Sequence, residues 1–245
     1  MGEILETLEK AYVSPVDIEF TVNFSNEKDY KINILQCRPF QVKTEEINVT
    51  YPKDVEVESI IFEVESGPII GSGISSIIDR IVYINPREYS ILNREQKYSI
   101  ARLIGKINQL ESSKHLKTIL IGPGRWGTSI PSLGISVRFA EINNIAVLGE
   151  ISELHDNLIP DISLGTHFFN DLVEREIIYF ALDSDKRINR KFFENSRNVL
   201  KTIIPGAEKW AFIVKVVECK NSTLNLYMDP LKQKGICYFT EKTSS

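Results

Sequence analysis

The chain has 245 residues, of which 42% are hydrophobic and 25% are charged. This mix is ordinary for a folded globular protein and excludes an intrinsically disordered chain. The formal net charge of −4 argues against nucleic acid as the main partner, because binding a phosphate backbone needs a basic face.

We expect neither a membrane span nor a signal peptide. No apolar run approaches the roughly 20 residues that cross a bilayer, and residues 1–6 lack the basic and apolar segments of a signal peptide. Cys37, Cys219 and Cys237 show no CxxC spacing, so we expect three reduced thiols. We therefore expect a cytoplasmic protein with no membrane partner.

The first 40 residues predict a helix and a β-hairpin. Residues 1–12 carry apolar side chains at helical spacing without an N-cap, so we expect the end of a helix that starts upstream. Residues 16–22 alternate apolar and polar side chains, as a half-buried strand does. After a polar turn at residues 25–31, residues 32–38 read as the return strand.

The rest of the chain predicts a separate domain. Residues 41–58 are polar and poor in apolar side chains, so we expect a linker and a boundary near residue 45, which divides residues 1–45 from residues 46–245. Beyond the linker, strands and helices mix without strict alternation, which predicts an α+β or mixed α/β fold with a mixed sheet.

The expected elements of this second domain follow from apolar patterns and capping residues. The strands are expected at residues 60–64, 79–84, 117–121, 145–149 and 177–182, and a last group at 210–218, 223–228 and 235–240 is expected to form an antiparallel meander. Helices are expected from the cap Asn93 to about residue 111, at 168–175 and at 190–203, and a glycine-rich loop at 67–73.

Four polar side chains of the hairpin form the first candidate site. Asp17 and Glu19 are two positions apart on one strand, and Gln36 and Arg38 are two apart on the other, so each pair lies on one face. Carboxylate oxygens suit Mg²⁺, and the guanidinium fork suits phosphate. The residues alone leave two interpretations open, a metal–nucleotide site or a solvated face with a cross-strand ion pair.

The hairpin strings also resemble a known family. The run Ser14-Pro15-Val16-Asp17-Ile18-Glu19-Phe20, followed by Leu35-Gln36-Cys37-Arg38-Pro39, resembles the closing segment of the ATP-grasp domain of pyruvate phosphate dikinase and phosphoenolpyruvate synthase. The resemblance covers only the first 40 or so residues. It implies an ATP-grasp hairpin remnant followed by an uncharacterised mixed-sheet module.

The resemblance also implies roles for the four side chains. Glu19 and Gln36 would contact Mg²⁺ or the phosphates of ATP, Arg38 would face the γ-phosphate, and Asp17 would support the metal. The implied activity is ATP-dependent phosphotransfer, with pyruvate among the candidate acceptors. Within the ATP-grasp region, the partner of the hairpin would be the upstream part of the same protein.

Two departures from the family pattern limit the expectation. Glu19 and Gln36 lie 17 positions apart, further than in the family, which a longer turn at residues 25–31 accommodates. The family's phosphohistidine segment, a glycine-rich run that ends in T-x-H-A, does not follow the linker. We therefore expect a fragment of a phosphotransferase that is inactive by itself.

A glycine-rich loop is the second candidate site. A short apolar strand runs into Gly122-Pro123-Gly124-Arg125-Trp126-Gly127-Thr128-Ser129. Such a loop lets backbone N–H groups approach an anion while Arg125 supplies charge, which makes Gly122 and Gly124 candidate binding residues. The alternative is a tight structural turn whose Trp126 packs into the core.

His167 is the third candidate. It follows Gly165-Thr166 and opens an expected helix, where it could bind an anion or accept a phosphoryl group, with Asp171 orienting the ring. The alternative is a capping or packed histidine. If Arg125 and His167 share a pocket, residues 46–245 could instead be a non-catalytic module that binds an anion or a partner.

Overall fold

The computed structural model describes residues 2–12, 16–25, 29–39, 50–65, 67–152, 167–184, 187–219 and 222–241. The chain divides into two compact units, Met1–Lys43 and Thr44–Ser245. The predicted class is confirmed, because a β-hairpin precedes a body that mixes parallel and antiparallel strands with helices.

The first unit contains one helix and one hairpin. Helix α1 spans Gly2–Tyr12, and strands β1 (Val16–Phe24) and β2 (Tyr30–Pro39) pair in antiparallel fashion. Apolar residues spaced along α1, such as Leu5 and Leu8, are half-buried, and the helix packs beside β1. The predicted helix and both predicted strands are confirmed.

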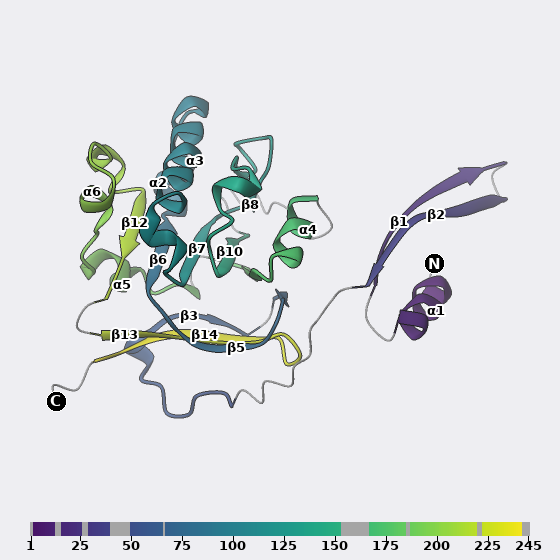
Figure 1. Ribbon diagram of the computed structural model, residues 1–245, viewed down its shortest axis with the longest axis horizontal. Coiled ribbons are helices and arrows are strands. Elements are labelled where there is room, and N and C mark those ends of the chain that lie inside the picture. Colours follow the sequence, from purple (N-terminus) through teal and green to yellow (C-terminus); the bar gives the residue numbers. More distant parts are fainter. Residues whose placement is uncertain are drawn as a thin grey trace. The chain divides into compact units, whose positions relative to one another are not determined.

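A six-stranded sheet forms the centre of the second unit (Figure 1). Its order is β12-β6-β7-β10-β11-β4, and the four middle strands run parallel to one another. Every residue of these middle strands is buried, as expected of parallel strands covered on both faces. The strands span β4 (Ile69–Ile70), β6 (Arg80–Ile84), β7 (Thr118–Pro123), β10 (Val147–Ile151), β11 (Ile178–Leu182) and β12 (Val214–Val217).

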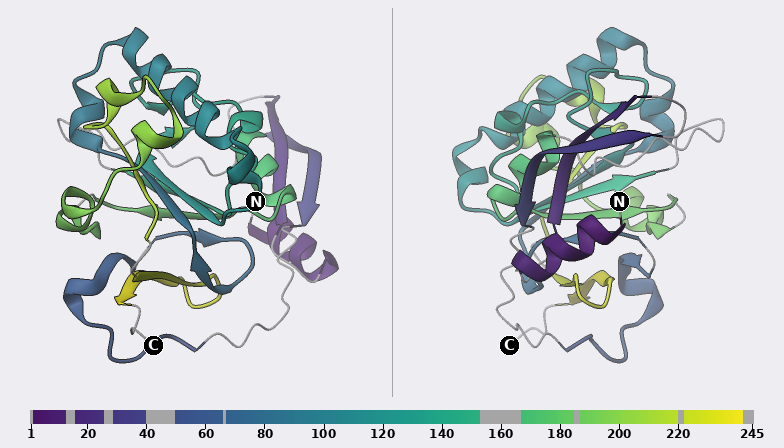
Figure 2. Two further views of the ribbon diagram at one scale, coloured as in Figure 1. Left: turned by 60° about the vertical axis from the view of Figure 1, so that its left-hand side comes forward. Right: turned by 90° about the vertical axis from the view of Figure 1, so that its right-hand side faces the viewer.

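A four-stranded antiparallel sheet covers one face of the six-stranded sheet. Its order is β3-β14-β13-β5, and in both views of Figure 2 the six-stranded sheet lies between it and the long helix of residues 94–108. Its strands span β3 (Ile60–Val64), β5 (Ile74–Ile78), β13 (Ser222–Asp229) and β14 (Lys234–Glu241). A further pair, β8 (Arg125–Trp126) and β9 (Gly134–Ile135), lies in the loops after β7.

Helices such as α3 cover the other face, whereas α5 contributes Phe193 to the core between the two sheets. The longest is α3, and Asn93 caps it as predicted, because the Asn93 side chain accepts from the N–H of Gln96 and the Gln96 side chain accepts from that of Asn93. The α-helices of this unit are α2 (Pro86–Ser90), α3 (Arg94–Asn108), α4 (His167–Glu174), α5 (Arg190–Asn195) and α6 (Leu200–Ile203). Short 3₁₀ turns occur at η1 (Val57–Ser59), η2 (Glu111–Lys114), η3 (Phe139–Glu141) and η6 (Glu208–Trp210).

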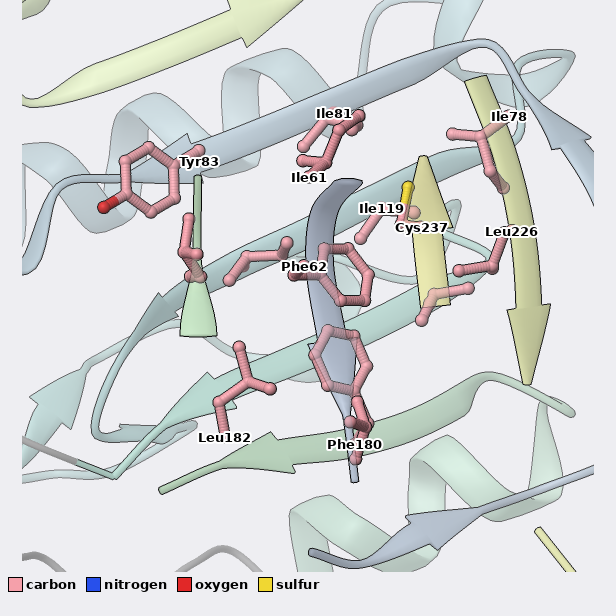
Figure 3. Close-up of a cluster of buried hydrophobic side chains, with 14 of the residues drawn as sticks. Ile61, Phe62, Ile78, Ile81, Tyr83, Ile119, Phe180, Leu182, Leu226 and Cys237 are labelled. Atoms are coloured by element: carbon pink, nitrogen blue, oxygen red, sulfur yellow. The ribbon is translucent and has the colours of Figure 1, made fainter. Parts of the chain in front are cut away.

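An apolar core fills the space between the two sheets (Figure 3). The rings of Phe62 in β3 and Phe180 in β11 stack with centroids 4.8 Å apart and so join one sheet to the other. Alternate residues of β7 divide between the faces: Ile119 and Ile121 belong to this core, whereas Leu120 lies beside Ile104 of α3. The period of two along each strand therefore produces three layers.

Three sequence-based expectations were wrong in detail. The helix expected at residues 190–203 is two helices, because Asn198 forms a bridge with Val217 and interrupts it. Strand β12 does not join a C-terminal meander; it pairs with β6 in the other sheet, leaving β13 and β14 as a hairpin. The loop expected at residues 67–73 contains the short strand β4, which pairs with β11.

Candidate functional site

The pairing of the hairpin brings the predicted polar positions together. Asp17 lies opposite Arg38, and Glu19 lies opposite Gln36. Directly paired residues share a face of an antiparallel ribbon, and so do residues two apart, so these four positions share one face. The Glu19 side chain is exposed and that of Gln36 is half-buried, whereas the side chains of Asp17 and Arg38 lie outside the described part of the chain.

A β-bulge adjoins this group. Glu19 pairs with Gln36, but the next residue, Phe20, pairs with Ile34, so Leu35 is the extra residue of β2. A bulge increases the local twist and changes the direction of the neighbouring side chains. The bulge lies next to the Glu19–Gln36 pair. It separates the candidate site from the part of the ribbon nearer the turn, residues 20–24 and 30–34.

The opposite face of the ribbon is apolar. Pairs such as Phe20 with Ile34 and Phe24 with Tyr30 follow one another along this face. The exposed fractions are 43% for Phe20, 70% for Phe24 and 62% for Tyr30. The ribbon is therefore amphipathic, with the candidate polar site on one side and a surface suited to packing on the other.

The described residues contain no preformed cluster for a metal ion, since no three or more His, Cys, Asp or Glu side chains gather within them. The donors predicted for Mg²⁺ are the carboxylate of Glu19 and the amide oxygen of Gln36. Both are hard oxygen ligands, which is the chemistry that Mg²⁺ prefers, but two protein donors leave most of an octahedral shell to other ligands.

In the second unit, packing explains the glycines of the predicted anion loop. A Cβ on Gly122 would lie 2.6 Å from Ile135 Cδ1 and 2.7 Å from Trp126 Cζ2. Gly124 has a φ of +65°, and a Cβ there would lie 2.3 Å from the carbonyl oxygen of Leu133. Trp126 is only 1% exposed, so the loop forms the tight turn around a buried tryptophan that the sequence left open as the alternative.

A buried carboxylate lies behind this loop and was missed by the sequence analysis. Glu150, in the central strand β10, is 1% exposed. The backbone N–H of Trp126 donates to Glu150 Oε1 at 2.9 Å, and the hydroxyl of Tyr179 donates to Oε2 at 2.6 Å. The available signal was one acidic residue inside the otherwise apolar run Val147–Ile151.

The loop also touches the start of α4. A Cβ on Gly127 would lie 2.4 Å from Cδ2 of Phe168, the neighbour of His167. Arg125 is half-buried in the same loop. The fold thus brings the loop of Arg125 to the first turn of α4, while the side chain of His167 lies outside the described part of the chain.

Comparison with known proteins finds a family match in the N-terminal part of the chain. Residues 1–59 match the family described as pyruvate phosphate dikinase, AMP/ATP-binding domain. The match confirms the resemblance indicated by the hairpin strings, and it extends to the end of η1. The remainder of the chain is unassigned.

No curated protein and no solved structure matches the chain. Among the helices of the described residues, none has the length and apolar character needed to span a bilayer.

Proposed function

We propose that the hairpin supplies the phosphate-facing edge of the ATP site of a phosphotransferase similar to pyruvate phosphate dikinase and phosphoenolpyruvate synthase. The observation that carries this proposal is the register, which pairs Asp17 with Arg38 and Glu19 with Gln36 inside a segment that matches an AMP/ATP-binding domain.

Each side chain has a role that follows from its chemistry. Arg38 binds the γ-phosphate through its planar fork and offsets the charge of the transferring group. Glu19 and Gln36 would offer oxygen atoms to Mg²⁺, with Asp17 in support, which is the ligand chemistry that this ion prefers. When bound, Mg²⁺ neutralises phosphate charge.

The proposal is tested by substitution in the longest natural protein that carries this chain, with ATP-dependent phosphotransfer as the measurement. Arg38→Ala is expected to lower the rate about 10²–10³-fold, the usual effect of removing one preorganised charge contact. Glu19→Gln is expected to raise the Mg²⁺ concentration needed for half-maximal rate. Pyruvate is the first acceptor to test.

Matched controls come from the same polar face of the ribbon. Asn23 and Lys31 form a pair beyond the bulge. Asn23→Ala and Lys31→Ala should leave the rate within about twofold of wild type, because screening weakens distant surface charges. Equal losses in the control and site variants would reject the assignment of these four residues.

The 245-residue chain by itself is proposed to bind Mg·ATP weakly or not at all, because one hairpin supplies few of the contacts that enclose a nucleotide. Isothermal titration of the chain with Mg·ATP measures this. Micromolar affinity would show that the chain holds a more complete site than we propose.

A second candidate function concerns the loop of Arg125. The contact between Gly127 and Phe168 favours a shared anion site for Arg125, Gly122, Gly124 and His167, which would make residues 46–245 a binding module or a phosphohistidine carrier. The carrier predicts acid-labile labelling by ATP that His167→Ala abolishes. The binding module predicts a loss of anion affinity in Arg125→Ala without any labelling.

A further inference from the structure

A groove separates the beginning of α3 from the loop that follows β8. Leu92, Arg94 and Lys97 line one side, and Ser129, Ile130 and Ser132 line the other, around a cavity of about 490 Å³. Its volume falls in the range of small-molecule sites. The groove belongs entirely to the second unit, and Ser129 is the one described lining residue that it has in common with the glycine-rich loop of Arg125.

The charged side chains described in the lining of the groove are positive. Among the described residues, its lining includes two cations and no carboxylate, and neither Arg94 nor Lys97 forms an ion pair with another of these residues. Burial lowers the pKa of Lys97, so its charge is less well solvated than that of a surface lysine. An anion in the groove would offset that cost.

Aromatic rings hold both cations in place. The Lys97 ammonium lies 5.2 Å from the ring centroid of Tyr89, and the Arg94 guanidinium carbon lies 5.7 Å from that of Tyr98. Contacts of this kind order a cation while leaving its N–H donors available to a ligand. The Tyr89 hydroxyl donates to the carbonyl of Gly134 at 2.9 Å, so the same ring is tied to the loop across the groove.

The opposite wall is shaped by the loop's own hydrogen bonds. The N–H of Ile130 donates to Thr128 Oγ1 at 3.1 Å, and the N–H of Leu133 donates to the carbonyl of Ile130 at 3.0 Å. This turn presents the exposed hydroxyl groups of Ser129 and Ser132 toward the groove as further donors. A wall already fixed by internal bonds binds a ligand at lower entropic cost.

The lining also includes apolar side chains. Leu92 is half-buried, and Ile130 is 52% exposed at the edge of the groove. Cationic and hydroxyl donors beside apolar side chains suit a ligand with an anionic head and an apolar body. We propose that this groove binds a small phosphate monoester, with Arg94, Lys97, Ser129 and Ser132 on the phosphate and Leu92 and Ile130 on the organic part.

The test is isothermal titration of the whole chain with phenyl phosphate and with inorganic phosphate at constant ionic strength. Phenyl phosphate is expected to bind more tightly, because only it reaches Leu92 and Ile130. Arg94→Gln and Lys97→Gln should each weaken binding about tenfold, the effect of losing one charge-assisted hydrogen bond. Ile130→Ser should reduce the advantage of phenyl phosphate over inorganic phosphate.

Lys106→Gln is the matched control, since it removes one positive charge from the same helix α3 outside this groove. It should change the affinity less than about twofold. No binding of either probe, or equal weakening by all three charge variants, would overturn the proposal. If Arg125→Ala abolished binding of the probe while Arg94→Gln left the affinity unchanged, the ligand would be assigned to the Arg125 loop and not to this groove. Circular dichroism confirms that each variant is folded.

Discussion

Glu150 is a carboxylate buried inside the central sheet of the second unit. A carboxyl group removed from water is costly unless its oxygens are hydrogen-bonded. Here both oxygens accept bonds, one from the backbone of Trp126 and one from Tyr179. The side chain therefore joins the loop after β7 to the neighbouring strand β11, and Trp126 strengthens this link by donating its indole N–H to the carbonyl of Gly149.

Removing this acceptor should destabilise the fold. Glu150→Ala is expected to lower the free energy of unfolding by about 2–4 kcal/mol, because two donors lose their partner and a cavity remains. Tyr179→Phe removes the hydroxyl that donates to Glu150 and should cost about 1 kcal/mol. Urea denaturation measures both. The control is Glu194→Ala in α5, an exposed position expected to change stability by less than about 0.5 kcal/mol.

A similar loss in Glu194→Ala and Glu150→Ala would contradict a structural role for the buried carboxylate.

The glycines of the loop after β7 show why a glycine-rich sequence does not by itself identify an anion site. A glycine-rich turn can approach an anion or accommodate a close contact, and the sequence pattern is the same in both cases. At Gly122 and Gly124 the reason is the close contact, because a Cβ would lie too near Ile135 Cδ1 at the first position and the carbonyl oxygen of Leu133 at the second.

At the scale of elements, the strands with strong local signals were predictable. The apolar runs of β7, β10 and β11 fix each strand without reference to its neighbours, and Asn93 with Gln96 fixes the start of α3. The candidate group on the hairpin was predictable for the same reason, because a period of two places Glu19 beside Asp17 whatever the tertiary fold.

Features that depend on distant partners were not predictable. Nothing in residues 214–217 indicates that β12 joins β6 instead of β13, because the choice depends on pairing across more than a hundred residues. The break between α5 and α6 also depends on partners elsewhere in the chain, at residues 211–216. The Asn198 side chain donates to the carbonyls of Ala211 and Val214 and accepts from the N–H groups of Leu200 and Val216.

Asn198 is half-buried and joins two segments of the chain through its side chain, so its loss should have a large effect on stability. Asn198→Ala is expected to lower the free energy of unfolding by about 2 kcal/mol or more, since it leaves backbone groups of two segments without partners. Asn195→Ala, at the exposed end of α5, serves as the control and should be nearly neutral. Thermal or urea unfolding distinguishes them, and equal effects would exclude this role of Asn198.

At the scale of the whole molecule, the two units differ in how they bury apolar surface. The described members of the inter-sheet core come from residues 61–239. The hairpin, in contrast, keeps Phe20, Phe24 and Tyr30 partly or largely exposed. An isolated two-stranded ribbon is marginal in water, so the first unit depends on additional contacts for its stability, whereas the second has a core of its own.

This difference predicts that residues 44–245 fold without residues 1–43. The truncated chain should unfold cooperatively, with a melting temperature within about 2 °C of the unit's transition in the whole chain, because the described core loses no side chain. Differential scanning calorimetry measures the transition. As a control, removal of residues 222–245 takes β13 and β14 from the four-stranded sheet and should abolish it. If the chain without residues 1–43 instead lost its cooperative transition, residues 1–43 would have to contribute to the stability of the second unit, and the hairpin could not be treated as a separable part of the protein.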